Sequence, residues 1–187
     1  MDAMVPRYRE DKATQVAAML IGLRGGKMSH LKLMKLLYLV DRTALIRWGR
    51  PVTYDRYVSM PHGPVLSYTL DRINSEVPPE GESYWQRYIS PPDADYEVRL
   101  LRRCPVDQLS PAEEALVREV FEQFGHLSRW QIRDYTHQLP EWRDPQGSSI
   151  ELPIEDILKA GGLPDDEIEA IMEELGGVAA ADYLLGD

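Results

Sequence analysis

The sequence predicts a compact, mainly helical α+β domain with a small antiparallel β-hairpin or sheet and an acidic, helical C-terminal extension. Apolar residues recur at helical spacing over most of the 187 residues, and two short segments rich in aromatic and β-branched residues suit strands. Hydrophobic residues make up 43% of the chain and charged residues 28%, which is typical of a globular protein. We expect one domain over residues 1–150 and the extension over residues 151–187, packed on the domain or trailing from it.

Two helices are expected in the first 50 residues. The range 12–23 has an apolar stripe and ends at Gly25-Gly26. A second helix follows Ser29, which suits an N-cap, and covers about residues 31–48. Its apolar stripe is so wide that we expect a central helix packed on more than one side. On the helical wheel, the side chains opposite the stripe are Lys32, Lys35, Arg42 and Thr43.

The middle of the chain is expected to be less regular. Residues 52–58 suit a short extended segment, whereas two prolines and a glycine within residues 60–64 exclude a regular element there. A helix is expected over residues 65–74 and a loop over residues 77–81. The segments 84–89 and 96–101 are expected to pair as a hairpin across a longer loop.

Capping signals mark the helices of the second half. Ser110-Pro111-Ala112-Glu113 has the pattern of a capping box, and the helix it begins ends at Gly125. Ser128 caps a further helix that Pro140 terminates. In the extension we expect a helix over residues 154–160 and another over residues 164–175.

Charge is distributed unevenly along the chain. Residues 1–150 contain 20 basic and 20 acidic side chains, whereas residues 151–187 contain one lysine and 11 acids. The chain therefore has no overall excess of the cations that drive non-specific nucleic-acid binding. The first 50 residues, with 10 basic and four acidic side chains, still allow a local basic patch.

Several kinds of site and location are disfavoured by what the sequence contains. The longest strongly apolar stretch, residues 36–40, is far below the ~20 residues that span a bilayer, and the first ten residues have no apolar signal core. We therefore expect no membrane association and a cytoplasmic location. Cys104 is the single cysteine, and no two of the four histidines lie three or four residues apart, so we expect no metal and no cofactor. The glycine-rich segment 22–27 departs from the P-loop spacing and is interpreted as a helix-terminating turn.

Three polar residues are candidates for chemistry. Asp41 lies on the apolar side of the second helix, where a buried carboxylate needs a cation or several donors. It is interpreted as a structural hydrogen-bond hub or ion pair, with an active-site carboxylate as the alternative. His62 and His137 lie in or beside proline-containing loops, where they could act as acid–base groups or could bind loop carbonyls as neutral side chains.

Four parts of the chain together resemble one known family. Lys32-Leu33-Met34-Lys35-Leu36-Leu37-Tyr38-Leu39-Val40-Asp41 resembles its K-L-x-K-L-L-Y-x-x-D helix. Trp48-Gly49-Arg50-Pro51 resembles its G-x-P turn, and His62-Gly63-Pro64-Val65 resembles its Y-G-P-V segment with histidine in place of tyrosine. The range 127–142 resembles its late L-S-x-x-x-L-x-x-x-T-H-x-x-x-x-W stretch. In order and spacing these segments, within about residues 12–145, are similar to the Panacea domain of SocA-like antitoxins.

The resemblance implies a compact helical domain with a small β element and a role without catalysis. Members of this family pair with unrelated toxins in bacterial and prophage toxin–antitoxin operons and neutralise them by direct binding. One member is an adaptor that delivers its toxin to an ATP-dependent protease. The implied partner is a cognate toxin encoded nearby. The motif positions, which we expect to be structural, are Lys35, Leu36, Tyr38, Asp41, Gly49, Pro51, Gly63, Pro64, His137 and Trp142.

The leading hypothesis is thus an antitoxin that covers the active surface of its toxin. Aromatic residues and a loop histidine are the candidate contacts, although core packing explains the aromatics as well. These candidates are Tyr54, Tyr57, His62, Tyr84, Trp85 and Tyr88. The acidic extension either covers a basic surface of the toxin or is a capping helix with a solvated face.

Two alternatives come from other functional classes. A small hydrolase or transferase would bring His62, His137 and Asp41 together around a concave pocket. A nucleic-acid-binding regulator would use a basic patch, but the overall acidity makes this the weaker alternative. The side chains of that patch would be Arg7, Arg9, Lys12, Arg24, Lys27, Lys32 and Lys35.

Overall fold

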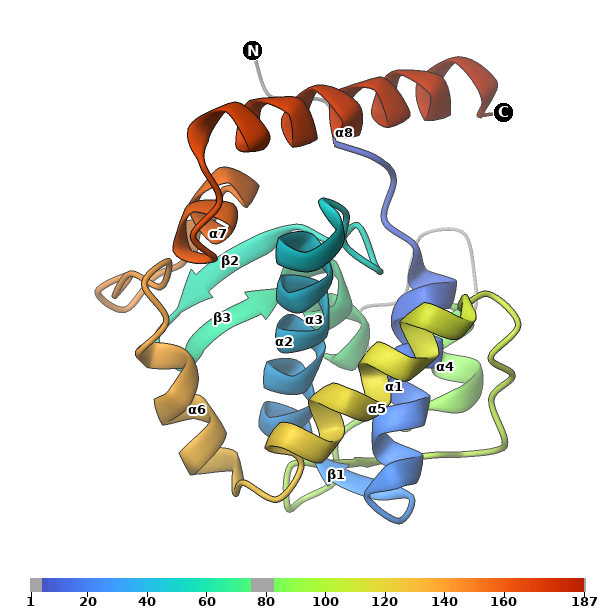
Figure 1. Ribbon diagram of the computed structural model, residues 1–187. Coiled ribbons are helices and arrows are strands. Elements are labelled where there is room, and N and C mark those ends of the chain that lie inside the picture. The colour runs from blue at the N-terminus through green and yellow to red at the C-terminus, as the bar shows by residue number, and fades with distance from the viewer. Residues whose placement is uncertain (1–4, 75–82, 187) are drawn as a thin grey trace.

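A computed structural model describes residues 5–74 and 83–186 (Figure 1). The loop expected at residues 77–81 lies outside this part of the chain. The first two helices, α1 (Glu10–Leu23) and α2 (His30–Trp48), agree with the expected ranges to within two residues. As predicted, α2 is central: it contacts α1 and, further along the chain, α5 (Pro111–Phe124), α6 (Arg129–His137) and α7 (Ile154–Ala160).

The expectation that α2 has a polar face exposed to solvent is wrong. Lys35 is fully buried and Lys32 is only 7% exposed, although both were placed opposite the apolar stripe. The physical reason is that helices and strands surround α2, so its polar side also faces protein.

Within residues 5–74 and 83–186, five short strands form two small antiparallel sheets. β1 (Lys27–Ser29) pairs with β4 (Glu97–Arg99), with Met28 opposite Val98. The second sheet has the order β3-β2-β5 and consists of β2 (Tyr57–Met60), β3 (Gly63–Leu66) and β5 (Ile150–Glu151). With the helices, these sheets make the α+β architecture that the sequence predicts.

The expectation that residues 60–64 exclude a regular element is wrong. A β-hairpin turns at Pro61-His62 and continues into β3, where Pro64 lies opposite Ser59. Because β3 is at the edge of its sheet, the missing N–H of proline is tolerated. The helix expected from residue 65 begins two residues later, as α3 (Ser67–Ile73).

The hairpin expected between residues 84–89 and 96–101 is also wrong. The first segment forms a short helix, α4 (Tyr84–Tyr88), which the Ser83 hydroxyl caps by accepting from the Gln86 N–H. Trp85 is 1% exposed and α4 packs on α1, so burial decides this structure over the strand propensity of aromatic residues. One isolated bridge, between Ile89 and Leu100, remains of the expected pairing.

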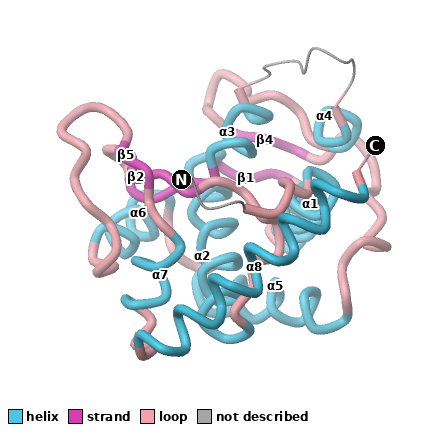
Figure 2. Tube along the Cα trace, turned by 90° about the horizontal axis from the view of Figure 1, so that it is seen from above, coloured by secondary structure: helices cyan, strands magenta, loops and turns pink. Residues whose placement is uncertain are grey.

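The extension packs on the domain through α7 and α8 (Asp165–Leu185). Ile157 and Leu158 are fully buried, and α7 contacts the C-terminal part of α2. α8 then runs across one end of the domain from α7 toward the side of α1, as the two views agree (Figures 1 and 2). It extends ten residues beyond the expected end at residue 175, because Gly176 and Gly177 do not end the helix, which continues through them.

Candidate functional site

The motif positions of α2 converge on the β2–β3 hairpin. Lys35 Nζ donates to the Pro64 carbonyl at 2.8 Å, which attaches α2 to β3. Gly63 has a φ of +101°, and a Cβ there would lie 2.7 Å from Thr136 Oγ1 and 3.1 Å from Lys35 Nζ. A side chain at Gly63 would therefore be strained and would also collide with α6 and with the lysine.

Lys35 is a buried amine without a carboxylate partner among the described residues. Burial lowers its pKa from 10.5 to about 7, because the charged form loses hydration that the protein does not replace. The amine therefore changes charge near neutral pH. Its geometry, which is one hydrogen bond to a backbone carbonyl, is that of a structural contact.

A second connection from α2 reaches the loop after α6. The Glu141 carboxylate is 3% exposed and accepts from the Tyr38 hydroxyl at 2.8 Å and from Arg42 Nε at 2.5 Å. Arg42 supplies the opposite charge that a buried carboxylate requires. Burial, and to a smaller extent the charge of Glu141, raises the pKa of Tyr38. This hydroxyl therefore stays protonated and remains a donor.

His137 and Trp142 stack beside the turn of the hairpin. Their ring centroids are 4.1 Å apart at 14°, and Trp142 Nε1 donates to the Met60 carbonyl at 3.2 Å. Burial, followed by the positive charges of Arg133 and Lys35, lowers the pKa of His137 and favours its neutral form. These contacts hold the end of α6 and its following loop against the hairpin, which agrees with the structural interpretation of His137.

Asp41 is a hydrogen-bond hub. Its carboxylate accepts from the Val52 and Thr53 N–H groups at 2.9 and 3.1 Å, from the Thr53 hydroxyl, and from the Tyr57 hydroxyl at 3.0 Å. Complete burial raises its pKa to about 6 despite these donors. The carboxylate thereby attaches the segment after α2, which begins at the left-handed C-cap Gly49 and the buried Pro51, to the helix itself.

The candidate catalytic triad is not assembled. The partners of Asp41 all come from residues 52–57, His62 is exposed at the hairpin turn, and His137 is stacked on Trp142. No hydrogen bond joins any two of the three within residues 5–74 and 83–186. The hydrolase or transferase built on these residues is therefore not supported.

The candidate basic patch is not continuous, although Arg24, Lys27 and Lys32 line one pocket. Lys32 and Lys35 are buried, and three other members form ion pairs: Arg9 with Asp11, Lys12 with Glu113, and Lys27 with Asp93 and Glu97. These cations are thus either inside the protein or already neutralised. The geometry does not support a continuous basic surface for nucleic acid.

The candidate partner contacts divide between core and surface. Tyr57 and Trp85 are 2% and 1% exposed, so they pack in the core and present no surface to a partner. Tyr54, Tyr84 and Tyr88 are half-buried, and His62 is exposed.

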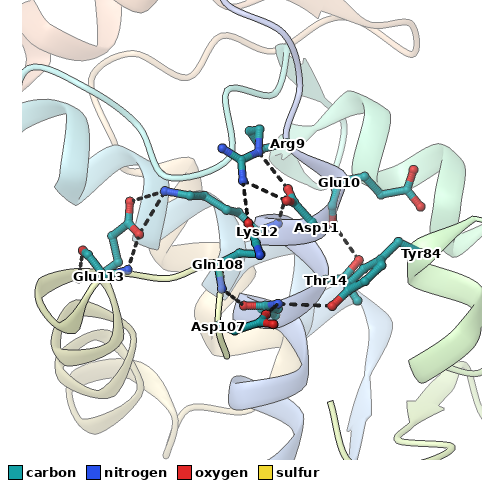
Figure 3. A network of polar contacts seen from close by, with 11 residues as sticks. Arg9, Glu10, Asp11, Lys12, Thr14, Tyr84, Asp107, Gln108 and Glu113 are labelled. Atoms are coloured by element: carbon teal, nitrogen blue, oxygen red, sulfur yellow. Dashed lines mark hydrogen bonds and ion pairs between the residues drawn. The ribbon is translucent and has the colours of Figure 1, made fainter. Parts of the chain in front are cut away.

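Tyr84 belongs to a polar network at the start of α1 (Figure 3). Its hydroxyl accepts from Gln15 Nε2 at 3.1 Å, and the same amide nitrogen donates to Asp107 at 2.8 Å. Nearby, Lys12 Nζ donates to Glu113 at 2.8 Å and connects α1 to α5 (Figure 3). Tyr84 therefore already has a structural role.

An aromatic surface on α6 escaped the sequence-based candidates. Trp130 is 47% exposed, and two guanidinium groups approach its ring, with Arg129 Cζ 4.9 Å and Arg133 Cζ 5.0 Å from the ring centroid. Tyr135 on the same helix is 37% exposed. The signal was present in the sequence, because both aromatics fall off the stripe of Ile132 and Thr136 that α6 buries.

The described residues contain neither a membrane-spanning helix nor a cluster of metal-binding side chains. No helix of this part of the chain is long and apolar enough to span a membrane. No group of three or more His, Cys, Asp or Glu side chains within it is placed to hold a metal ion.

Comparison with known proteins identifies a family. The family model described as antitoxin SocA-like, Panacea domain, matches residues 33–143. Comparisons with curated proteins and with solved structures give no significant match. The matched range covers α2, the β2–β3 hairpin, α6 and the loop with Glu141 and Trp142, which together contain the buried contacts described above. Because this match covers more than half of the chain, the protein belongs to the SocA-like antitoxin family with a Panacea domain.

Proposed function

We propose that this protein is an antitoxin that neutralises a partner toxin, encoded nearby, by direct binding in the cytoplasm. The observation that carries the proposal is the family match over residues 33–143. The motif side chains in that range are engaged in internal contacts, such as Lys35 with Pro64 and Tyr38 with Glu141. They build a frame, so recognition falls to side chains that project from it.

The exposed side of α6 is the surface we propose for the toxin. Tryptophan and arginine are among the residue types that most often dominate binding energy, and Trp130, Arg129 and Arg133 gather there. The contacts with the two arginines restrict the Trp130 ring before binding, so less side-chain entropy is lost in the complex. A stable complex needs about 800 Å² of buried surface on each partner, so the contact would extend beyond α6.

The acidic extension is proposed as a second contact with a basic region of the toxin. Asp165, Asp166, Glu167, Glu173 and Glu174 are exposed on α8, and the extension carries the negative charge of the chain. Complementary charges chiefly speed association and select the partner. This part of the proposal predicts that binding becomes slower as salt rises.

Co-expression with the product of the neighbouring gene tests the proposal. The full-length protein should restore growth of cells in which that product is toxic. Trp130→Ala should weaken the rescue, whereas Tyr96→Ala, which removes an aromatic side chain that is 63% exposed elsewhere, should not. Toxicity that persists beside well-expressed wild-type protein would contradict the antitoxin role.

The level of the toxin separates two mechanisms. Occlusion, which we favour, leaves the toxin present and bound to this protein. Delivery to an ATP-dependent protease, the alternative, makes the toxin disappear whenever this protein is present. An immunoblot of the co-expressing cells, repeated in a strain without the protease, distinguishes these outcomes.

A further inference from the structure

A basic pocket lies where the turn after α1, strand β1 and the start of α2 meet the turn between α5 and α6. Its volume is about 590 Å³, within the 300–1,000 Å³ usual for small-molecule sites. The glycine-rich segment after α1 contributes two of its cations, because Gly25 and Gly26 adopt φ values of +100° and +98° and turn the chain sharply there. The charged side chains that line it are Arg24, Lys27, Lys32, Arg129 and Glu97.

The pocket has more positive charge than its own acids neutralise. Glu97 is its one lining carboxylate among the described residues, and it pairs with Lys27 at 2.7 Å. Asp93 approaches the same lysine at 3.2 Å. Arg24, Lys32 and Arg129 have no carboxylate partner in the described part of the chain.

Lys32 is the deepest of these cations. The residue is 7% exposed, and its ammonium donates to the carbonyl of Gly125. Burial, and to a smaller extent the charge of Arg24, lowers the pKa of Lys32, so the two cations disfavour each other. A neutral carbonyl does not balance a buried ammonium, whereas a bound anion would.

Two neutral features add to this preference for an anion. Ser29 lines the pocket, and its hydroxyl is buried without a hydrogen-bond partner. The nine-residue helix α6 begins at the pocket, where Ser128 and Arg129 form part of the lining and the positive end of the helix dipole lies. An unpartnered donor and a helix N-terminus thus accompany three unpaired cations.

We propose that this pocket binds the phosphate group of a small phosphorylated molecule. A phosphate monoester presents several anionic oxygens, which match guanidinium forks and an ammonium. The volume exceeds what inorganic phosphate fills, so the remainder would accommodate the group that the phosphate is attached to, such as a nucleoside.

The proposal is tested on the purified full-length protein in the absence of the toxin. Isothermal titration calorimetry would use three probes at fixed ionic strength: inorganic phosphate, adenosine monophosphate and adenosine. We expect saturable binding of inorganic phosphate, of adenosine monophosphate or of both, and no binding of adenosine. Stronger binding of adenosine monophosphate would assign the rest of the pocket to the nucleoside, and equal binding would assign the site to phosphate alone.

Variants of two exposed or half-buried arginines locate the site. Arg24→Gln and Arg129→Gln should each weaken phosphate binding at least tenfold. Arg118→Gln, an exposed arginine on α5, is the matched control and should leave it unchanged. Circular dichroism checks that each variant is folded. Binding that is absent for both phosphorylated probes, unaffected by the Arg24 and Arg129 variants, or equally strong for adenosine would overturn the proposal.

Discussion

The buried amine of Lys35 should make the stability of this protein depend on pH. In the folded state its pKa is lowered to about 7 by burial, whereas in the unfolded chain a lysine has a pKa of about 10.4. Between these values the unfolded state binds one more proton than the folded state, so the free energy of unfolding rises with pH. The cost of the buried charge is therefore present below pH 7 and is lost progressively above it.

The size of the effect follows from the two pKa values. From pH 7.0 to 8.5 the folded lysine goes from half protonated to almost fully neutral, while the unfolded lysine stays protonated. With RT of about 0.59 kcal/mol, the integrated gain in the free energy of unfolding is about 1.6 kcal/mol. Lys35→Met keeps most of the side-chain volume and removes the titrating group, so this gain should disappear.

Urea unfolding at pH 7.0, 7.5, 8.0 and 8.5 measures the gain. The slope with pH is the appropriate quantity, because the methionine variant also leaves the Pro64 carbonyl without its donor and so changes the absolute stability. Comparison of the two proteins cancels other titrating groups, such as Cys104, whose pKa burial raises to about 11. Lys159→Met, at an exposed position on α7, should retain the slope of the wild type. Parallel slopes for the wild type and Lys35→Met would refute the argument.

Three other changes probe the frame. Asp41→Asn should lower the free energy of unfolding at pH 7 by about 3 kcal/mol in a urea titration, because an amide NH₂ would then face N–H and O–H donors. Unchanged stability would contradict the role of Asp41 as a hydrogen-bond hub. Gly63→Ala should lower the free energy of unfolding by at least ~1 kcal/mol more than Gly147→Ala does. Both glycines have positive φ, but a Cβ at Gly147 meets nothing within 4 Å, whereas one at Gly63 meets α6. Equal losses of Tm would exclude this contact with α6. A fragment of residues 1–149 should fail to fold cooperatively, because it lacks two fully buried α7 side chains whose burial contributes about 1.5–3 kcal/mol each. A fragment of residues 1–163 should fold. Cooperative melting of the shorter fragment would show that the extension is dispensable for folding.

Local signals predicted most of the helices. The capping boxes at Ser110 and Ser128 are present in the structure, with each serine hydroxyl accepting from the N–H three residues later. The wide stripe of α2 correctly indicated a central helix, and Asp41 on that side was correctly interpreted as a hydrogen-bond hub. These predictions depend on residues within a few turns of one another, which a sequence displays directly.

The wrong predictions depend on contacts between distant segments. Trp85 lies in a helix because α1 buries it, and Pro64 is accommodated in a strand because that strand is at an edge. Strand β4 pairs with β1, about 70 residues earlier in the chain, rather than with its sequence neighbour. Lys35 appeared to be on a solvated face because periodicity cannot show that the β2–β3 hairpin and α6 cover it.

The candidate site was predicted unevenly for the same reason. The resemblance implied structural roles for the motif residues, but the particular internal contacts they make follow from the structure alone. Trp130 was not among the predicted contacts, because those were taken from aromatic-rich segments that contain Tyr57 and Trp85, which the fold buries. An aromatic residue off the buried stripe of a helix is the better indicator of a contact surface.

The most direct measurement for the central claim is the affinity between this protein and the purified product of its neighbouring gene. Titration calorimetry in physiological salt should show a stoichiometric complex with a Kd in the nanomolar range, which is within the range of standard-sized interfaces, and loss of toxin activity in step with complex formation. A toxin that stays fully active at saturating concentrations of this protein, with no heat of binding, would contradict the account.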